Sequence, residues 1–438
     1  MNLSKFKLLE SNQIIYYDVD ENALYNSEGA ALSSFPTLPL EFYQESAKIH
    51  GSRKKSNKPT ALRILFGHAC NYSCGYCMQK DIGNPDERPK NSNLEKFINA
   101  IKDNLDLENL ERIELWGGEP FLYWNDIQPV MEFLDSPGRH FFISTNGSAL
   151  RDKHIDFFVN LKGSIAIGIS HDGPGQELLR GEDIFQKKSV ISAIKRIDDL
   201  APKIQFSFNT VISRQNFDLF EINDYFVDIA LRLDLKNVKL SFILGRNYDE
   251  TNSQNSTHHV IDKDNHKKFK EVMESYMDFS ISQLYKVSER PKPLLRSNVF
   301  DGPHGPVNFA LSMKNKIPVT ATSNCGADAE DILSLDINGN IRLCPHASEK
   351  YIAGPISQLK GIRILQLDLE RKKSHCVSCN VRRLCKSSCP IKFPDEVFLQ
   401  NCKNEKIWYG AVQKAALKLI FGEKVELLEI GLEGTHEL

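Results

Sequence analysis

The chain has 438 residues, of which 41% are apolar and 26% charged, enough for roughly two or three domains with hydrophobic cores. A net charge of −2 gives no electrostatic reason to expect nucleic-acid binding. No apolar run approaches the roughly 20 residues that span a membrane, and residues 1–15 lack the apolar core of a signal peptide, so a cytoplasmic protein is expected. In the reducing cytoplasm, ten cysteines are better explained as metal ligands than as disulfides.

Residues 1–60 are expected to form a small N-terminal extension. Ile14–Val19 is a strand candidate, and Asp20–Asn26 is rich in turn residues. A basic run over residues 53–58 lies among serine and asparagine, and we interpret it as a solvated linker.

From Ala61 onward, short apolar runs alternate with stretches of helical periodicity. The predicted strands are Leu62–Phe66, Arg112–Trp116, His140–Ser144, Ser164–Ser170, Ile204–Val211 and Val238–Leu244. The predicted helices are Leu94–Leu105, Asp126–Leu134, Lys153–Leu161, Asp183–Leu200, Asn216–Leu231 and Asn265–Val287. Strict alternation indicates an α/β fold with a parallel sheet. Six such units over residues 61–290 suit a partial barrel, although periodicity alone also allows an open, doubly wound sheet.

Three cysteines follow the first of these strands directly, at Cys70, Cys74 and Cys77. A loop this compact can direct three thiolates toward one metal ion or one small metal cluster. Three thiolates would fill three of the four iron positions of a [4Fe-4S] cluster and leave the fourth iron open. A zinc site or three structural cysteines are the alternatives, but zinc motifs usually pair one CxxC with a second Cys or His pair, and this loop has no such partner nearby.

With the aromatic Tyr76 before its last cysteine, this CxxxCxxC loop resembles the radical S-adenosylmethionine (radical SAM) enzymes. The resemblance implies a partial (β/α)6 TIM-like barrel. It also implies that the open iron chelates the amino and carboxylate groups of SAM. The reduced cluster would then cleave SAM to a 5'-deoxyadenosyl radical.

Further polar motifs directly follow the next three predicted strands. In a parallel barrel, the catalytic and binding residues lie at these C-terminal ends of the strands. Each is weak alone, because Gly, Asn-Gly and Asp-Gly are common in turns, but their joint placement matches the family's SAM-binding segments. Arg180 is the candidate for the SAM carboxylate, since its fork suits a carboxylate. With Tyr76, the residues implied to bind SAM are Gly117, Gly118, Glu119, Pro120, Ser144, Asn146, Ser170, Asp172 and Arg180.

Residues 291–320 are expected to form a linker. A cysteine-rich domain is predicted to follow over residues 321–403. Residues 404–438 are predicted to form a C-terminal helix, at 404–421, and a tail. Ile332–Asp336 and Ile341–Cys344 flank Asn338-Gly339 and predict a β-hairpin. Seven cysteines lie in this region, with Gly339 between the first two: Cys325, Cys344, Cys376, Cys379, Cys385, Cys389 and Cys402. Their pattern resembles the SPASM domain, which carries up to two auxiliary [4Fe-4S] clusters. The resemblance implies one set of Cys376, Cys379, Cys385 and Cys402, and an incomplete set of Cys325, Cys344 and Cys389. Zinc bound by the same thiolates is the alternative.

The two resemblances imply a peptide-modifying radical SAM oxidoreductase that takes electrons from a flavodoxin or ferredoxin and acts on a ribosomally made precursor peptide. The run Cys77–Pro85 resembles the sequences of a subgroup of these enzymes. That subgroup joins an aromatic ring to a β-carbon and so makes three-residue cyclophanes. One alternative is a sulfatase-type maturase that oxidises Ser or Cys to formylglycine. Those enzymes carry an Asp after the second SPASM cysteine, where this chain has Pro345.

The other alternative is a noncatalytic iron–sulfur protein, which would not need SAM-contacting loops. The sequence assigns no catalytic base, although Asp328, Glu330 and His346 lie near the C-terminal cysteines. Residues 1–60 are too short and too poor in helix signals for a complete winged-helix leader-binding domain, so no leader-binding role is assigned to them.

Overall fold

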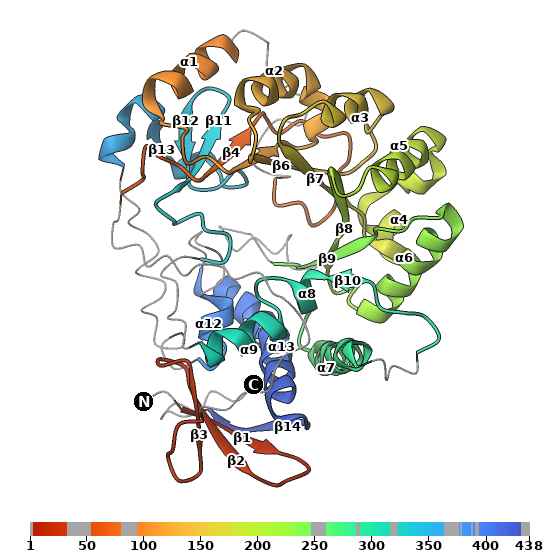
Figure 1. Cartoon of the computed structure of the whole chain (residues 1–438), viewed down its shortest axis with the longest axis vertical. Helices are drawn as coiled ribbons and strands as arrows, with labels where there is room; N and C mark the ends of the chain where they lie inside the picture. Colours follow the sequence, from red (N-terminus) through yellow and green to blue (C-terminus); the bar gives the residue numbers. More distant parts are fainter. Residues whose placement is uncertain are drawn as a thin grey trace.

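The computed structural model describes residues 3–32, 54–79, 94–246, 260–285, 290–315, 323–362, 376, 379–386, 389 and 394–430. Its centre is a curved sheet of ten strands in the order β10-β9-β8-β7-β6-β5-β4-β11-β12-β13 (Figure 1). Six parallel strands of this sheet follow one another along the chain: β4 (Ala61–Leu65), β5 (Arg112–Trp116), β6 (His140–Thr145), β7 (Ser164–Ser170), β8 (Ile204–Ile212) and β9 (Lys239–Leu244).

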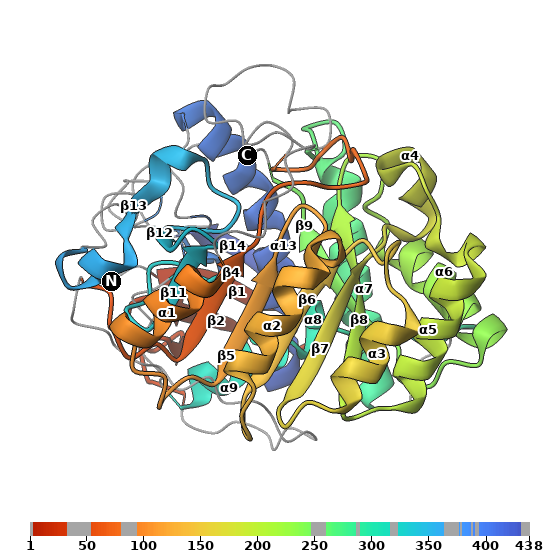
Figure 2. The same ribbon diagram turned by 90° about the horizontal axis from the view of Figure 1, so that it is seen from above.

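Helices follow these strands in turn: α1 (Leu94–Asn104), α2 (Trp124–Leu134), α3 (Asp152–Val159), α4 (Gln176–Arg180), α5 (Lys188–Asp199), α6 (Leu219–Leu233) and α7 (His266–Leu284). Figures 1 and 2 show α1, α2, α3, α5 and α6 along the outer face of the sheet. The six predicted strands are confirmed to within one residue at each end. Because the order of the six parallel strands β4 to β9 never reverses, their arrangement is that of a partial barrel and not of a doubly wound sheet.

The two faces of the sheet differ in polarity because side chains alternate along each strand. Leu62, Ile113 and Phe141 have no exposed surface and belong to the main hydrophobic core. The opposite, concave face carries charged side chains: Arg63 pairs in register with Glu114 on the neighbouring strand. The inside of the barrel is therefore polar, as a site for a polar ligand requires.

The predicted hairpin is confirmed and extends the same sheet. It consists of β11 (Ile332–Asp336) and β12 (Asn340–Arg342), followed by β13 (Ile352–Pro355). Gly339 has a φ of +80° in the turn, a conformation that glycine adopts without a steric penalty. Strand β11 runs parallel to β4. The cysteine-rich segment is thereby attached directly to the strand that precedes the Cys70 loop.

Residues 291–320, expected as a linker, contain regular structure in their described part. They form β10 (Arg296–Ser297), α8 (Asn298–Asp301) and α9 (Pro306–Lys314). The Asn298 side chain replaces a strand partner for β9: its Oδ1 accepts from the Phe242 N–H at 2.8 Å, and its Nδ2 donates to the Phe242 carbonyl at 2.9 Å. Side-chain pairing of this kind leaves no periodic signal in the sequence.

The two ends of the chain form a second, four-stranded sheet in the order β14-β1-β2-β3 (Figure 1). Its strands are β1 (Leu3–Leu8), β2 (Ile14–Asp18), β3 (Ala23–Asn26) and β14 (Val425–Ile430). The long helix α13 (Asp395–Phe421) leads into β14 and begins nine residues before the predicted start at residue 404. No helix among the described residues is long and apolar enough to cross a membrane.

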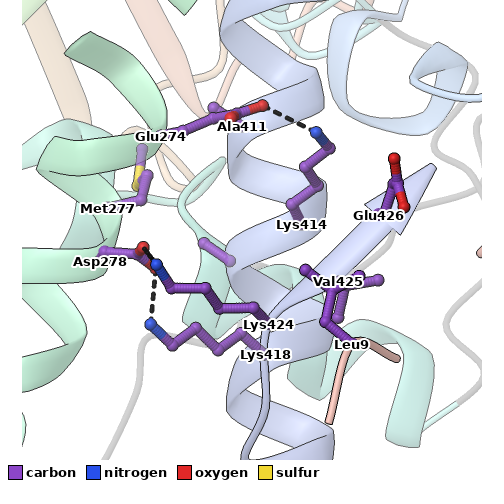
Figure 3. Close-up of a pocket in the computed structure, with 11 residues that line it drawn as sticks. Leu9, Glu274, Met277, Asp278, Ala411, Lys414, Lys418, Lys424, Val425 and Glu426 are labelled. Carbon is purple, nitrogen blue, oxygen red and sulfur yellow. Dashed lines mark hydrogen bonds and ion pairs between the residues drawn. The ribbon is translucent and has the colours of Figure 1, made fainter. Parts of the chain in front are cut away.

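Helix α13 is joined to α7 by two ion pairs. Lys414 lies 2.7 Å from Glu274, and Lys418 lies 2.6 Å from Asp278. Between these helices and β14 is a cavity of about 320 Å³, whose charged side chains are largely engaged with one another in Figure 3. The short helix α12 (Arg382–Cys385) is tied to the N-terminal sheet, because Arg383 donates to the carbonyls of Val19 and Asp20.

We expect His154 to make the fold sensitive to acid. Its ring is buried, stacks on Phe121 with centroids 4.5 Å apart, and accepts the Arg151 N–H at the start of α3. Burial lowers the pKa of His154 from 6.5 to about 4. Below pH 6.5 the unfolded chain therefore binds a proton at His154 that the folded chain does not bind. The free energy of unfolding decreases as the pH falls from 6.5 to about 4, by up to about 3 kcal/mol in total.

The measurement is the free energy of unfolding in urea at several pH values for the wild type and for His154→Gln. The wild type should lose stability relative to the variant as the pH falls from 7 to 5. Parallel pH profiles for the two proteins would show that His154 does not cause the acid sensitivity.

Candidate active site

The three N-terminal cysteines lie on the loop after β4, as predicted, and their thiols are free. The Cys77 N–H donates to the Cys74 carbonyl at 3.1 Å, and the Tyr72 N–H points at the Cys70 sulfur at 3.4 Å. Burial is the main cause that raises the pKa of Cys74 to about 11; the Arg180 charge opposes the increase, and the charges of Cys77 and Cys70 add to it. Three mutually repelling thiolates in one loop need a compensating cation. The residues therefore fit a cationic iron–sulfur core.

Gly118 lets the loop after β5 pack directly against the backbone of the cysteine loop. A Cβ atom at this position would lie 2.3 Å from the His68 carbonyl oxygen and 2.4 Å from that of Ala69. The Gly118 N–H donates to the Gly67 carbonyl at 3.0 Å, and the Glu119 N–H donates to the Ala69 carbonyl at 2.9 Å. The second glycine of Gly-Gly-Glu-Pro thus has a structural requirement of its own.

Replacing Gly118 by alanine should push the two loops apart, because both obstructing atoms are backbone atoms that cannot rotate away. Overpacking of this kind costs about 1 to 3 kcal/mol, and SAM affinity should fall with it. Gly410→Ala in α13 is the matched control, since its Cβ would meet nothing within 4 Å and alanine favours a helix. Thermal unfolding and SAM binding by equilibrium dialysis measure both effects. Equal behaviour of the two variants would contradict the steric argument.

The Glu119 side chain, expected to accept an ammonium group, is fully buried and already binds the end of β6. It accepts from the Thr145 hydroxyl at 2.6 Å, the Asn146 N–H at 2.7 Å and the Phe121 N–H at 3.1 Å. Burial raises its pKa, and these three donors counteract the increase. Glu119 therefore fixes the Asn146 turn in addition to any contact with a ligand.

Asn146 in turn contacts the cysteine loop. Its Nδ2 donates to Asn71 Oδ1 at 2.9 Å and lies 3.9 Å from the Cys70 sulfur, while Asn71 donates to the Ser148 hydroxyl at 2.8 Å. Sequence reasoning missed Asn71, although its place inside the cysteine motif was a usable signal. Amide dipoles beside a sulfur ligand stabilise its negative charge.

Asp172 gathers donors from three separate segments. Its carboxylate has no exposed surface and accepts from the Tyr76 hydroxyl, from Arg180 Nε at 2.9 Å and from the Val211 N–H at 2.9 Å. The Arg180 guanidinium carbon also lies 5.3 Å from the centroid of the Tyr76 ring. The candidate for the SAM carboxylate is thus engaged by Asp172. This network links the cysteine loop to β7 and β8.

The remaining predicted SAM contacts line the same edge. Gly117 and Pro120 flank the Gly118-Glu119 turn after β5, and Ser144 and Ser170 lie near the ends of β6 and β7. All predicted segments are therefore brought together at the C-terminal ends of four adjacent parallel strands. Of the run Cys77–Pro85, residues 80–85 lie outside the described residues.

Four of the C-terminal cysteines lie around one small apolar cluster, while Cys379 and Cys385 pack against the main core. The His346 N–H points at the Cys344 sulfur at 3.4 Å, and the His346 ring packs edge-on against Trp116, with centroids 4.6 Å apart, near the end of β5. Burial raises the pKa of Cys402, on α13, to about 12, and the charges of Cys379 and Cys376 contribute. One apolar cluster is contacted by members of both predicted sets, namely Cys344, Cys376, Cys389 and Cys402.

Among the described residues, no three His, Cys, Asp or Glu side chains converge as ligands of a single metal ion do. In a [4Fe-4S] cluster each thiolate binds a different iron, so its ligands stand farther apart than those of one zinc ion, for which each Zn–S bond is about 2.3 Å. Measuring the iron and zinc content of the protein therefore distinguishes [4Fe-4S] clusters from zinc sites.

Residues 64–216 match the Radical SAM superfamily. The Radical SAM cyclopropyl synthase TigE of Paramaledivibacter caminithermalis is 26% identical over 245 residues, which are 51% of this chain and 50% of that protein. An S-adenosylmethionine-dependent nucleotide dehydratase of Psychrobacter lutiphocae is 27% identical over 181 residues, which are 38% of this chain and 61% of that protein. The chain spans about half to three fifths of the length of these curated relatives.

Two solved structures share the fold. The enzyme anSMEcpe with bound AdoMet matches with a TM-score of 0.57 at 17% identity, over 82% of this chain and 98% of that chain. SuiB of Streptococcus suis matches with a TM-score of 0.50 at 16% identity, over 78% of this chain and 77% of that chain. This similarity shows an α/β radical SAM fold with a parallel sheet at its core.

Proposed function

We propose that the protein is a radical SAM maturase that cross-links a ribosomally synthesised peptide, because residues 64–216 match the Radical SAM superfamily. One arrangement carries this proposal. The Cys70 loop, the Glu119 turn and the Asp172–Arg180 pair meet at one edge of the barrel, and His346 of the cysteine-rich segment packs on Trp116 beside them. A radical-generating site next to a second thiol-rich site suits an oxidation that removes a hydrogen atom and an electron.

Different residues of the chain have separate roles in the proposed reaction. Cys70, Cys74 and Cys77 would hold the cluster that supplies reductive SAM cleavage when it is bound. Glu119 and the Asp172–Arg180 pair fix the loops around SAM, so that its reactive carbon is held at one place. The polar concave face would then present one C–H bond of the peptide and exclude competing reactants.

The cysteine-rich segment is proposed to be a SPASM domain with two auxiliary [4Fe-4S] clusters. Cys376, Cys379, Cys385 and Cys402 would hold one of them. Cys325, Cys344 and Cys389 would leave the other with an open iron or a non-cysteine ligand. One of the two would accept an electron as the new bond closes, and a flavodoxin or ferredoxin would serve as the external electron carrier.

Ring formation and a peptide substrate are each supported by one similar protein. TigE is named a cyclopropyl synthase, and a further structure of anSMEcpe holds AdoMet and a peptide named Cp18Cys, with a TM-score of 0.57 to this chain. We propose an aromatic-to-β-carbon cyclophane as the cross-link, from the run Cys77–Pro85. Formylglycine formation, the alternative that the sequence resemblance implies, is the second candidate, but Pro345 stands where a proton-accepting Asp would be expected.

The test is anaerobic incubation of the reconstituted enzyme with SAM, a reductant and the precursor peptide encoded beside it. Ring closure should lower the peptide mass by two hydrogens and consume one SAM per bond. An aldehyde located on a single Ser or Cys by tandem fragmentation would favour formylglycine formation. A gain of one methyl group, or no change in any neighbouring peptide, would contradict the proposal.

A further inference from the structure

Two buried cations lie beneath the segment that contains Cys325. Lys55, from the run expected to be a solvated linker, is only 8% exposed, and its ammonium donates to the carbonyls of Ala327, Ala329 and Ile332 at 2.6 to 2.8 Å. It thereby shapes the turn that follows Cys325. Burial lowers the pKa of Lys55 to about 8, which leaves it mostly charged at neutral pH.

Arg63 is the second cation and reaches the cysteine segment directly. From the concave face of β4, its Nη2 donates to the Cys325 carbonyl, and its Nε donates to Glu114 at 2.9 Å. Burial alone would lower the pKa of Arg63, but Glu114 and the thiols of Cys325 and Cys344 hold it above its usual value. Arg63 is therefore a permanent charge close to two predicted cluster ligands.

The countercharge of Arg63 is incomplete. Glu114 also binds Arg112 at 3.0 Å and accepts from the Trp116 indole N–H at 3.2 Å. Two arginines thus share one carboxylate, and the trio of Arg63, Arg112 and Glu114 carries a net charge of +1. Of the two arginines, Arg63 has a side chain that is 9% exposed and Arg112 one that is 46% exposed. Water therefore screens the charge of Arg112 far more than that of Arg63.

We propose that Arg63 sets the reduction potential of the auxiliary site at Cys325 and Cys344, with Glu114 limiting its effect. This inference rests on the proposed function, which places an iron–sulfur cluster there. A fixed positive charge stabilises the additional electron of the reduced state, and cluster potentials respond to local charge. In the proposed reaction, loss of one hydrogen atom to the adenosyl radical leaves a carbon radical. Ring closure would then release one proton and one electron. A cluster held at this site would supply the electron acceptor, and the charge of Arg63 would favour its reduction.

The proposal predicts shifts of opposite sign for the two partners of one ion pair. Arg63→Met should lower the potential, because a positive charge is removed, and Glu114→Gln should raise it, because the opposing charge is removed. Each should change the equilibrium constant for reduction about tenfold or more, which is about 59 mV for a one-electron couple. Arg63→Lys and Arg112→Gln are the matched controls and should shift it little. A purely structural pair would shift the potential in the same direction when either partner is lost.

The measurement is an EPR-monitored redox titration of the reconstituted full-length protein. The SAM-bound cluster is identified because its signal responds to SAM, and the cluster at Cys379 serves as an internal reference whose potential should not move. The third EPR signal is that of the cluster at Cys325 and Cys344. Opposite shifts of its potential in Arg63→Met and Glu114→Gln support the proposal, and unchanged potentials or shifts of the same sign overturn it. If Arg63→Met does not retain iron, Glu114→Gln decides alone. A wild-type protein without the third signal would instead refute the cluster assignment.

Discussion

Replacing Cys74 by alanine should abolish SAM cleavage. The thiols of Cys70, Cys74 and Cys77 occupy one short loop after β4, and a site that binds three irons through three thiolates has no spare ligand. Loss of one thiolate should release this cluster, and bound iron should fall from about 12 to about 8 atoms per chain, at four irons for each cluster. The measurement is 5'-deoxyadenosine formation under reducing conditions, together with iron analysis.

Cys379→Ala provides the matched comparison, because it removes one thiol from the C-terminal set and leaves the loop after β4 intact. It should retain part of the 5'-deoxyadenosine formation while making no cross-linked peptide. If both cysteine variants lose SAM cleavage equally, the division between a SAM site and an auxiliary site is wrong. Stoichiometric zinc with only four irons in the wild type would refute both auxiliary clusters.

The second large effect is expected from Asp172→Asn. The asparagine side chain keeps the shape but not the charge of a carboxylate that is fully buried and binds Arg180, Tyr76 and the Val211 N–H. Leaving a buried arginine without its countercharge costs about 3 to 5 kcal/mol. The loops that carry Tyr76 and Arg180 should also separate, so SAM binding should weaken. Urea unfolding and SAM binding report the two effects separately.

Asp156→Asn is the control for this substitution. Asp156 pairs with Arg196 at 2.7 Å, but its side chain is 65% exposed, and exposed ion pairs contribute little to stability. This variant should bind SAM like the wild type. An Asp172→Asn protein as stable as the Asp156→Asn protein would show that the buried network does not hold the site together.

The barrel could be predicted from the sequence because its signals are local. The strands are short apolar runs, as in Ser164–Ser170, and the cysteines that follow β4 are close in the chain. The strand β1 was missed, because its partner β14 lies at the other end of the sequence. No local pattern indicates such a pairing.

The electrostatics of the site could not be predicted for the same reason. Lys55 lies in a polar run typical of a linker, yet its acceptors are carbonyls more than 270 residues away. Arg180 was expected to face SAM, and only the fold shows that Asp172 engages it. Motif residues were identified correctly as a group, but their partners are set by tertiary contacts.

Transfer of deuterium from the peptide to 5'-deoxyadenosine tests the central claim most directly. The claim is that the radical formed at the Cys70 loop removes a hydrogen atom from a carbon of the bound peptide. A precursor with deuterium at the β-carbons of its core residues should yield 5'-deoxyadenosine heavier by one mass unit, in step with a cross-linked peptide that has lost that deuterium. Unlabelled 5'-deoxyadenosine from a reaction that forms cross-linked product at these carbons would contradict the account.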